Sequence, residues 1–193
     1  MSVYKYIVLA PIPEPNSSII MELIYRIAEF TKIQQHMQLK PHITLHRPLA
    51  LSEDKIIQVV ESVLGTTSKI TVTLGGLSNF GSSSIILPVH TTLELALFWV
   101  NLYQQLYSYP DYVAEVLDKE NSLHVTLASK VRHISIEDLA EASEIKISSS
   151  IIQIETIEIL RKDITRENSR WEKIKKIQFT KLKSSLETER IYF

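Results

Sequence analysis

Two short stretches of the sequence carry the same pattern of residues that could do acid–base chemistry. Residues 42–45 read HITL and residues 124–127 read HVTL, with the two histidines 82 residues apart. Side chains on a β-strand alternate between its two faces, so the histidine and the threonine of each motif share one face. The apolar residues between them point the other way, toward a core. Each motif is therefore expected to present one imidazole and one hydroxyl from a rigid strand.

Two imidazoles and two hydroxyls that meet in one small volume suit the transesterification or hydrolysis of a phosphodiester. One histidine takes a proton from the attacking hydroxyl, and the other gives a proton to the leaving oxygen. The free pKa of histidine, about 6.5, lies close to neutral pH, so the side chain can serve in either role. Threonine hydroxyls donate hydrogen bonds to the non-bridging oxygens, where negative charge develops. If the motif strands face each other across a cleft, the rings should stand roughly 6 Å apart, and no metal ion is needed.

A single His-x-Thr pattern is weak evidence for catalysis, because similar patterns occur elsewhere in the chain. Residues 90–93 read HTTL, but the middle residue is polar and the threonines are better explained as helix-cap residues. Residues 133–135 read HIS and follow Lys130 and Arg132, which is typical of an exposed loop. The repetition of the motif inside two apolar strands favours catalysis, while two structural histidines stay open as the alternative.

Hydrophobic periodicity predicts the elements that must position these motifs. Strands are expected at residues 3–10, 40–47, 69–77, 84–90, 122–129, 147–160 and 171–179, and helices at 17–37, 52–65, 91–107 and 135–142. Most neighbouring strands can pair as antiparallel hairpins, which predicts an α+β fold. A strand and a helix precede each motif, and this echo predicts two similar lobes that face each other. We expect residues 1–179 to form one bilobal domain and residues 180–193 to form a charged C-terminal tail.

Composition and charge exclude several classes of protein. The 193 residues are 45% hydrophobic, enough for a sizeable core, and the absence of cysteine excludes disulfides, thiolate catalysis and thiolate zinc sites. No run of about 18 apolar residues and no signal-peptide pattern occurs, so we expect a cytoplasmic protein with no membrane partner. A net charge of −1 argues against a protein that coats long nucleic acid by charge alone. Residues 161–183 hold nine basic and three acidic residues, which forms either a solvated surface or a patch that attracts a phosphate-bearing ligand.

At its two motifs, in KPHITL and LHVTL, the sequence resembles the 2H phosphoesterase superfamily, named for its paired His-x-Thr/Ser motifs. Within it, the sequence is similar to the RNA 2′,3′-cyclic phosphodiesterase or 2′-5′ RNA ligase-like branch, over about residues 3–179. The stretches LGGLSNFGSSSIILPV and IIQIETIEILRKD also resemble those of relatives, and the order of elements agrees. The resemblance implies a bilobal fold with two antiparallel sheets flanked by helices around a central groove. It also implies metal-independent chemistry, without cofactors, on 2′-linked or cyclic phosphodiesters of nucleotides.

The resemblance implies a role for each motif residue. His42 and His124 correspond to the acid/base pair, and Thr44 and Thr126 to the hydroxyls that hold the phosphate. Which histidine is the base depends on the direction of the reaction. Many relatives are more basic overall and carry an arginine or an aromatic residue just after a motif, where this chain has His46-Arg47 and Ala128-Ser129-Lys130.

Five further residues are candidates for contacts with the substrate: His46, Tyr4, Tyr6, Phe80 and Arg161. His46 lies four residues after the first motif histidine and is expected on the same strand face. The two tyrosines of the first strand could stack on a base, and Phe80 lies in a turn where relatives tend to carry an aromatic residue. Arg161 ends a long expected strand and could reach the phosphate. Packing in the core is the alternative for the aromatic residues.

Two functions of different classes follow from these residues. The first is an enzyme that opens a 2′,3′-cyclic phosphate or cleaves a 2′-5′ linkage in a nucleotide or at an RNA end. The second is a nucleotide or RNA-end binding module that uses the same groove without turnover. A metal site built from His42, His46 and His124 is a weaker idea, because no carboxylate ligands lie next to the motifs. No obligate protein partner is inferred.

Overall fold

A computed structural model describes residues 3–32, 40–47, 51–67, 69–81, 83–113, 123–131, 135–143 and 149–179. The strands are β1 (Tyr4–Pro11), β2 (His42–His46), β3 (Ile70–Leu74), β4 (Ser78–Phe80), β5 (Ser84–His90), β6 (His124–Ser129), β7 (Ser150–Ile154), β8 (Thr156–Asp163) and β9 (Glu172–Gln178). The helices are α1 (Asn16–Thr31), α2 (Glu53–Gly65), α3 (Leu93–Tyr107) and α4 (Ile136–Ser143). Strands and helices mix along the chain, which confirms the predicted α+β class.

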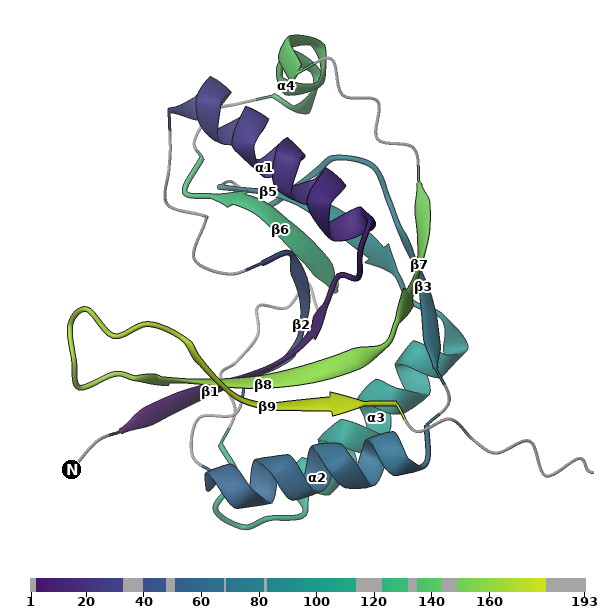
Figure 1. The fold of residues 1–193 in the computed structure, drawn as a ribbon, viewed down its shortest axis with the longest axis vertical. Helices are drawn as coiled ribbons and strands as arrows, with labels where there is room; N and C mark the ends of the chain where they lie inside the picture. Colours follow the sequence, from purple (N-terminus) through teal and green to yellow (C-terminus); the bar gives the residue numbers. More distant parts are fainter. Residues whose placement is uncertain are drawn as a thin grey trace, which may run out of the picture.

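The described strands form one continuous antiparallel sheet (Figure 1). Its order is β7-β3-β5-β6-β2-β1-β8-β9, and β4 pairs with β5 beside this path. The expectation of two sheets on two lobes is therefore corrected. The reason is that β2 and β6, the two motif strands, are hydrogen-bonded to each other at Ile43 and Val125 and so join the two halves of the strand order.

The helices pack in two pairs at opposite ends of the molecule (Figure 1). Helix α1 contacts α4 and β6, while α2 contacts α3 and β9, and α3 contacts β3. The helical spacing of Ile20, Leu23, Ile24 and Ile27 explains the position of α1, because all four are buried in one apolar cluster. The core is thus continuous along the sheet and holds the motif strands rigidly at its centre.

Several elements differ from those expected. The long strand predicted at 147–160 is two strands, because the chain breaks at Glu155 and β7 pairs with β3 whereas β8 pairs with β1. The expected turn at 78–83 contains the short strand β4. Helix α1 ends at Thr31 with Lys32 in the left-handed region at φ 57°, and residues 33–37 lie outside the described residues.

The predicted charged tail, residues 180–193, also lies outside the described residues, so the boundary at residue 179 stays a prediction. None of the helices in the described part of the chain combines the length and apolar character needed to cross a membrane.

Candidate functional site

The two motif strands lie side by side at the centre of the sheet rather than facing each other across a gap. Strands β2 and β6 are antiparallel with Ile43 opposite Val125, and both of these side chains are fully buried. One step along this register puts His42 opposite Thr126 and His124 opposite Thr44. All four side chains point away from Ile43 and Val125, so they share one face of the sheet, which we call the motif face.

The register also sets how far apart the two histidines are. His42 and His124 are diagonal neighbours on paired strands, a relation that separates backbone positions by about 7–8 Å. His42, Thr44 and His124 are half-buried, and Thr126 is exposed. A phosphate group placed between the two rings would therefore lie within reach of both imidazoles and both hydroxyls.

The backbone orients the ring of His42. Its Nδ1 lies 2.8 Å from the carbonyl oxygen of Lys40. A carbonyl can only accept, so Nδ1–H is the donor, and Nε2 of the neutral ring keeps its lone pair. Burial lowers the pKa of His42, and the charges of Arg47 and His124 lower it further, against the opposing effects of the Lys40 carbonyl and Glu158. Near neutral pH, His42 therefore presents a basic Nε2 on the motif face.

Phe80 lies beside the second motif histidine. The ring centroids of Phe80 and His124 are 4.5 Å apart, and the ring planes are inclined by 34°. Strand β4 carries Phe80 and pairs with β5, which in turn pairs with β6. Of the five candidate substrate contacts, Phe80 is the one that the structure brings to a motif histidine.

His46 does not share the face of His42, which corrects the expectation from strict alternation. In the β1–β2 pairing, Val8 lies opposite His46 and Leu9 opposite Thr44, so Leu45 is an extra residue, a β-bulge. The bulge turns His46 to the core side, where it is only 1% exposed. The proposed metal site of three histidines is therefore not assembled from these residues.

The interior site of His46 is aromatic. The ring centroids of His46 and Tyr103 are 4.5 Å apart in an edge-on arrangement. The Nε2 of His46 is hydrogen-bonded to the hydroxyl of Tyr112. The indole N–H of Trp99 donates to the carbonyl of the bulge residue Leu45 at 2.9 Å. Burial lowers the pKa of His46 to about 4, so its ring is neutral at pH 7.

The second motif strand has a bulge at the equivalent position. Ile85 lies opposite Ala128 and Ile86 opposite Thr126, which leaves Leu127 as the extra residue of β6. Ala128 is as deeply buried as His46. The alanine at this position of the second copy is a sequence signal that the first copy also turns inward here.

Tyr4, Tyr6 and Arg161 lie on the opposite face of the sheet from the motif side chains. Thr44 lies opposite Leu9 of β1, so the even-numbered residues of β1 point to the other face, and Arg161 lies opposite Tyr6. There the Arg161 guanidinium lies over the Tyr4 ring, 5.1 Å from its centroid.

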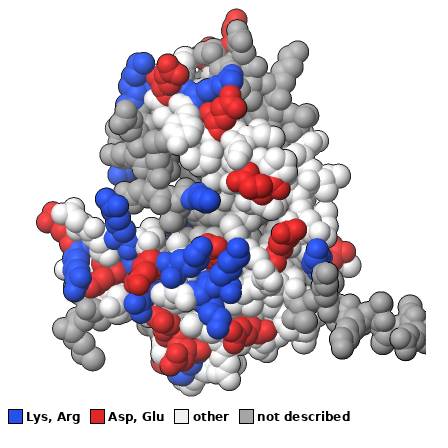
Figure 2. Space-filling model, viewed as in Figure 1, with Lys and Arg blue, Asp and Glu red and all other residues white. Residues whose placement is uncertain are grey.

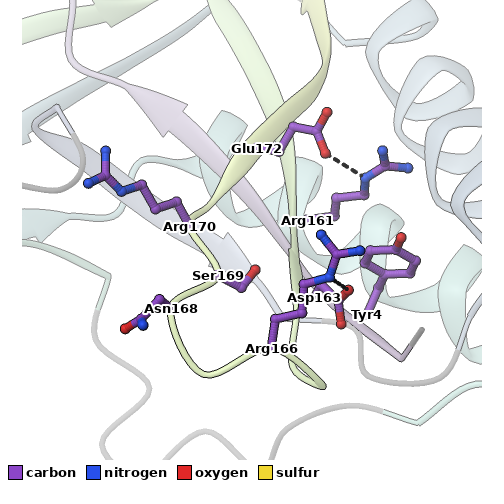
Figure 3. A pocket seen from close by; sticks show the side chains of 8 residues that line it. All are labelled: Tyr4, Arg161, Asp163, Arg166, Asn168, Ser169, Arg170 and Glu172. Carbon is purple, nitrogen blue, oxygen red and sulfur yellow. Dashed lines mark hydrogen bonds and ion pairs between the residues drawn. The ribbon is translucent and has the colours of Figure 1, made fainter. Parts of the chain in front are cut away.

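Arg161 is also held by two carboxylates, at 2.8 Å from Glu53 and 3.0 Å from Glu172. Figure 3 shows Arg161 and Tyr4 together at the edge of a small pocket beside the β8–β9 turn. The structure thus gives Arg161 a role in joining β8 to α2 and β9, and does not bring it to the two motifs.

A groove next to His42 contains residues that the sequence analysis missed as site residues. It has a volume of about 590 Å³ and extends from His42 over β1, β8 and β9. Its lining includes Glu158, Trp171, Lys173 and Lys176. Figure 2 shows basic side chains gathered over β8 and β9, interleaved with acidic ones. The basic run at residues 161–183 was the sequence signal for this surface.

Solved structures share this fold. Escherichia coli LigT complexed with 3′-AMP matches at a TM-score of 0.60 and 13% identity, over 93% of this chain and 99% of that one. A protein of Thermus thermophilus matches at a TM-score of 0.60 and 12% identity, and the match covers 91% of this chain and 97% of that one. A structure described as a phosphoesterase matches at a TM-score of 0.57 and 13% identity, and the match covers 92% of this chain and 99% of that one. A comparison with curated protein sequences finds no significant match.

The model of one sequence family matches most of the chain. This family is described as the 2′-5′ RNA ligase superfamily, and the match extends over residues 15–165, which include β2 and β6 with both motifs. The chain therefore belongs to the 2′-5′ RNA ligase superfamily.

Proposed function

We propose that the protein is a metal-independent phosphoesterase that opens 2′,3′-cyclic phosphates or cleaves 2′-5′ phosphodiesters of nucleotides or RNA ends. The observation that carries this proposal is the pairing of Ile43 with Val125, because it places two imidazoles and two hydroxyls on one face of adjacent strands. The two imidazoles can transfer protons from the attacking oxygen and to the leaving oxygen, and the two hydroxyls can hold the non-bridging oxygens.

The environment of His42 favours the role of general base in hydrolysis. Its Nε2 carries the lone pair and removes a proton from water, whose oxygen attacks the phosphorus of the cyclic phosphate. The bond from phosphorus to the 2′ or 3′ oxygen breaks, and His124 gives a proton to that leaving oxygen. The hydroxyls of Thr44 and Thr126 donate to the non-bridging oxygens and stabilise their growing charge. In the reverse direction the two histidines exchange roles.

The structural relatives support a nucleotide as the substrate class. Escherichia coli LigT was solved in complexes with 3′-AMP, ATP and NADP⁺. Those complexes concern proteins of 13 to 16% identity, so the extension to this chain is part of the proposal.

A turnover assay in the presence of EDTA tests the function. The protein is incubated with a nucleoside 2′,3′-cyclic phosphate, and the phosphomonoester product is identified by NMR. We expect turnover that resists EDTA and falls by about 10²–10⁴-fold in His42→Ala and in His124→Ala, which is the usual contribution of one acid or base.

The same assay separates the alternatives. Binding of the cyclic nucleotide without turnover by the parent protein would identify a binding module instead. Loss of activity in EDTA would show that a metal ion takes part and would contradict the metal-independent mechanism. Retention of full activity in either histidine variant would remove that ring from the mechanism.

A further inference from the structure

Strand β7 lies at one end of the sheet and has an edge that no described strand covers. Among the described strands it pairs with β3 alone, from Ile70 opposite Ile154 to Leu74 opposite Ser150. The strand that follows it in the chain, β8, has β1 on one edge and β9 on the other. The second edge of β7, which we call the free edge, is therefore open to a further strand.

The hydrogen bonds of β3 show which backbone groups of β7 point to the free edge. The N–H of Gly75, directly after β3, donates to the carbonyl of Pro88 in β5 at 2.7 Å. In an antiparallel ladder, the N–H and C=O of one residue point to one edge, and those of the next residue point to the other. The even-numbered residues of β3 therefore bond to β7, and the even-numbered residues of β7 bond back to them. The backbone groups of Ile151 and Gln153 point to the free edge.

Strand β9 leads the chain to this same edge. It pairs with β8 as far as Gln178 opposite Thr156, and the N–H of Phe179 then donates to the carbonyl of Glu155 at 3.3 Å. Glu155 follows β7 directly, and by the same alternation its carbonyl points to the side of the free edge. A chain that continued this ladder beyond Phe179 would run along β7.

The composition of the two segments suits such a pairing. Proteins protect exposed strand edges with charged side chains, lysine above all. The sequence of β7 is SIIQI, which has no charge, and the side chain of Ile151 is 73% exposed. Residues 180–184 are TKLKS, where Lys181 and Lys183 flank Leu182 in the alternating pattern of a strand. This segment equals β7 in length.

We propose that residues 180–184 continue β9 as a further strand and pair antiparallel with the free edge of β7. The segment is tethered at Phe179, so its effective concentration at this edge is high and it avoids most of the entropy loss that a separate molecule would meet. Its lysines then protect the new edge of the sheet, and β7 is kept from pairing with a second copy of the chain. This inference does not depend on the proposed phosphoesterase activity.

Amide hydrogen exchange, measured by NMR on the full-length protein, tests the proposal. The N–H groups of Ile151 and Gln153 point to the proposed strand, whereas the N–H of Ile152 bonds to β3 and serves as an internal reference. Leu182→Pro removes a donor and interrupts the proposed strand near its centre. Leu186→Pro makes the same substitution just beyond the strand and is the matched control.

We expect the amides of Ile151 and Gln153 to be protected from exchange in the parent protein. Leu182→Pro should speed their exchange by about tenfold or more, because the loss of two or more hydrogen bonds at a strand edge has an effect of this order. The Ile152 amide should be unaffected in this variant. Leu186→Pro should leave all three amides as they are in the parent protein.

Other exchange patterns would overturn the proposal. Fast exchange of Ile151 and Gln153 in the parent protein would show that no strand covers the edge. Equal exchange in Leu182→Pro and Leu186→Pro would show that residues 180–184 are not the strand that covers it. Protection that rises with protein concentration would show that a second copy of the chain occupies the edge instead.

Discussion

His42 and His124 begin the same four-residue pattern yet meet different surroundings. The Lys40 carbonyl fixes the tautomer of His42, and burial holds its pKa below the usual value. The ring of His124 lies against Phe80 instead. Two histidines of equal local sequence are thus made unequal by their neighbours, which is what an acid and a base acting on one phosphate require.

The pH profile of the reaction tests the role of His42. A general base is active in its neutral form, so with a lowered pKa the acidic limb of kcat/KM should lie below pH 6.5. The Glu158 carboxylate raises this pKa, so Glu158→Gln should move the limb to still lower pH. Initial rates measured with a cyclic mononucleotide over a range of acidic pH give the pH at which kcat/KM falls.

Glu155→Gln is the control for this measurement, because Glu155 lines the same groove and is not among the groups that most strongly shift the pKa of His42. We expect it to leave the limb in place. A shift of the limb to higher pH in Glu158→Gln would contradict the assignment of His42 as the base.

At the scale of strands and helices, the two motif strands are built alike. Each carries the histidine and the threonine on one face and then a bulge, at Leu45 and at Leu127. The bulges end the alternation and return the next residue to the core. The run of alternating polar residues that begins at each motif histidine therefore stops after the threonine on both strands.

Arg161 belongs to the contact between β8 and α2. Arg161→Gln removes its ion pairs with Glu53 and Glu172, so we expect a lower midpoint of thermal unfolding. Because it lies on the face away from the motifs, kcat/KM for the cyclic mononucleotide should stay unchanged. A large loss of activity in a folded variant would place Arg161 at the substrate after all.

Local patterns predicted the elements, but not their register. Alternation in HITL and HVTL was enough to place each histidine with its threonine, because the period of a strand is local. The inward turn of His46 depends on a bulge against β1, and the separation of Tyr4, Tyr6 and Arg161 from the motifs depends on which residues lie opposite one another. Pairing between distant strands sets both features, so a single sequence read locally does not contain them.

At the scale of the whole molecule, His46 ties the central sheet to α3 and the segment after it. It lies among Tyr103, Tyr112 and the Trp99–Leu45 hydrogen bond, and it is nearly inaccessible to solvent. A buried imidazole with a pKa of about 4 makes the stability of the fold depend on pH.

Acidification should destabilise the protein through this group. The unfolded chain binds a proton near pH 6.5, and the folded protein binds it only near pH 4, so stability is full above this window and falls as pH drops through it. The loss is on the order of 3 kcal/mol of unfolding free energy. Urea unfolding at pH 7 and at pH 4.5 measures it.

His46→Leu should weaken this pH dependence, leaving the part due to other groups such as His42. Tyr112→Phe removes the hydroxyl but keeps His46 buried, so it should retain the dependence, since burial is the cause of the low pKa. An unchanged dependence in His46→Leu would show that other groups are responsible.

The ladder between β2 and β6 has a consequence for the dynamics of catalysis. Many enzymes assemble their reacting groups by closing one domain onto another, and their turnover then slows with the friction of the solvent. Here the two imidazoles project from the same hydrogen-bonded pair of strands, so we expect their separation to stay unchanged when the outer helices move. In the proposed phosphoesterase, a viscogen such as sucrose should therefore slow substrate binding and product release without changing the separation of the two imidazoles.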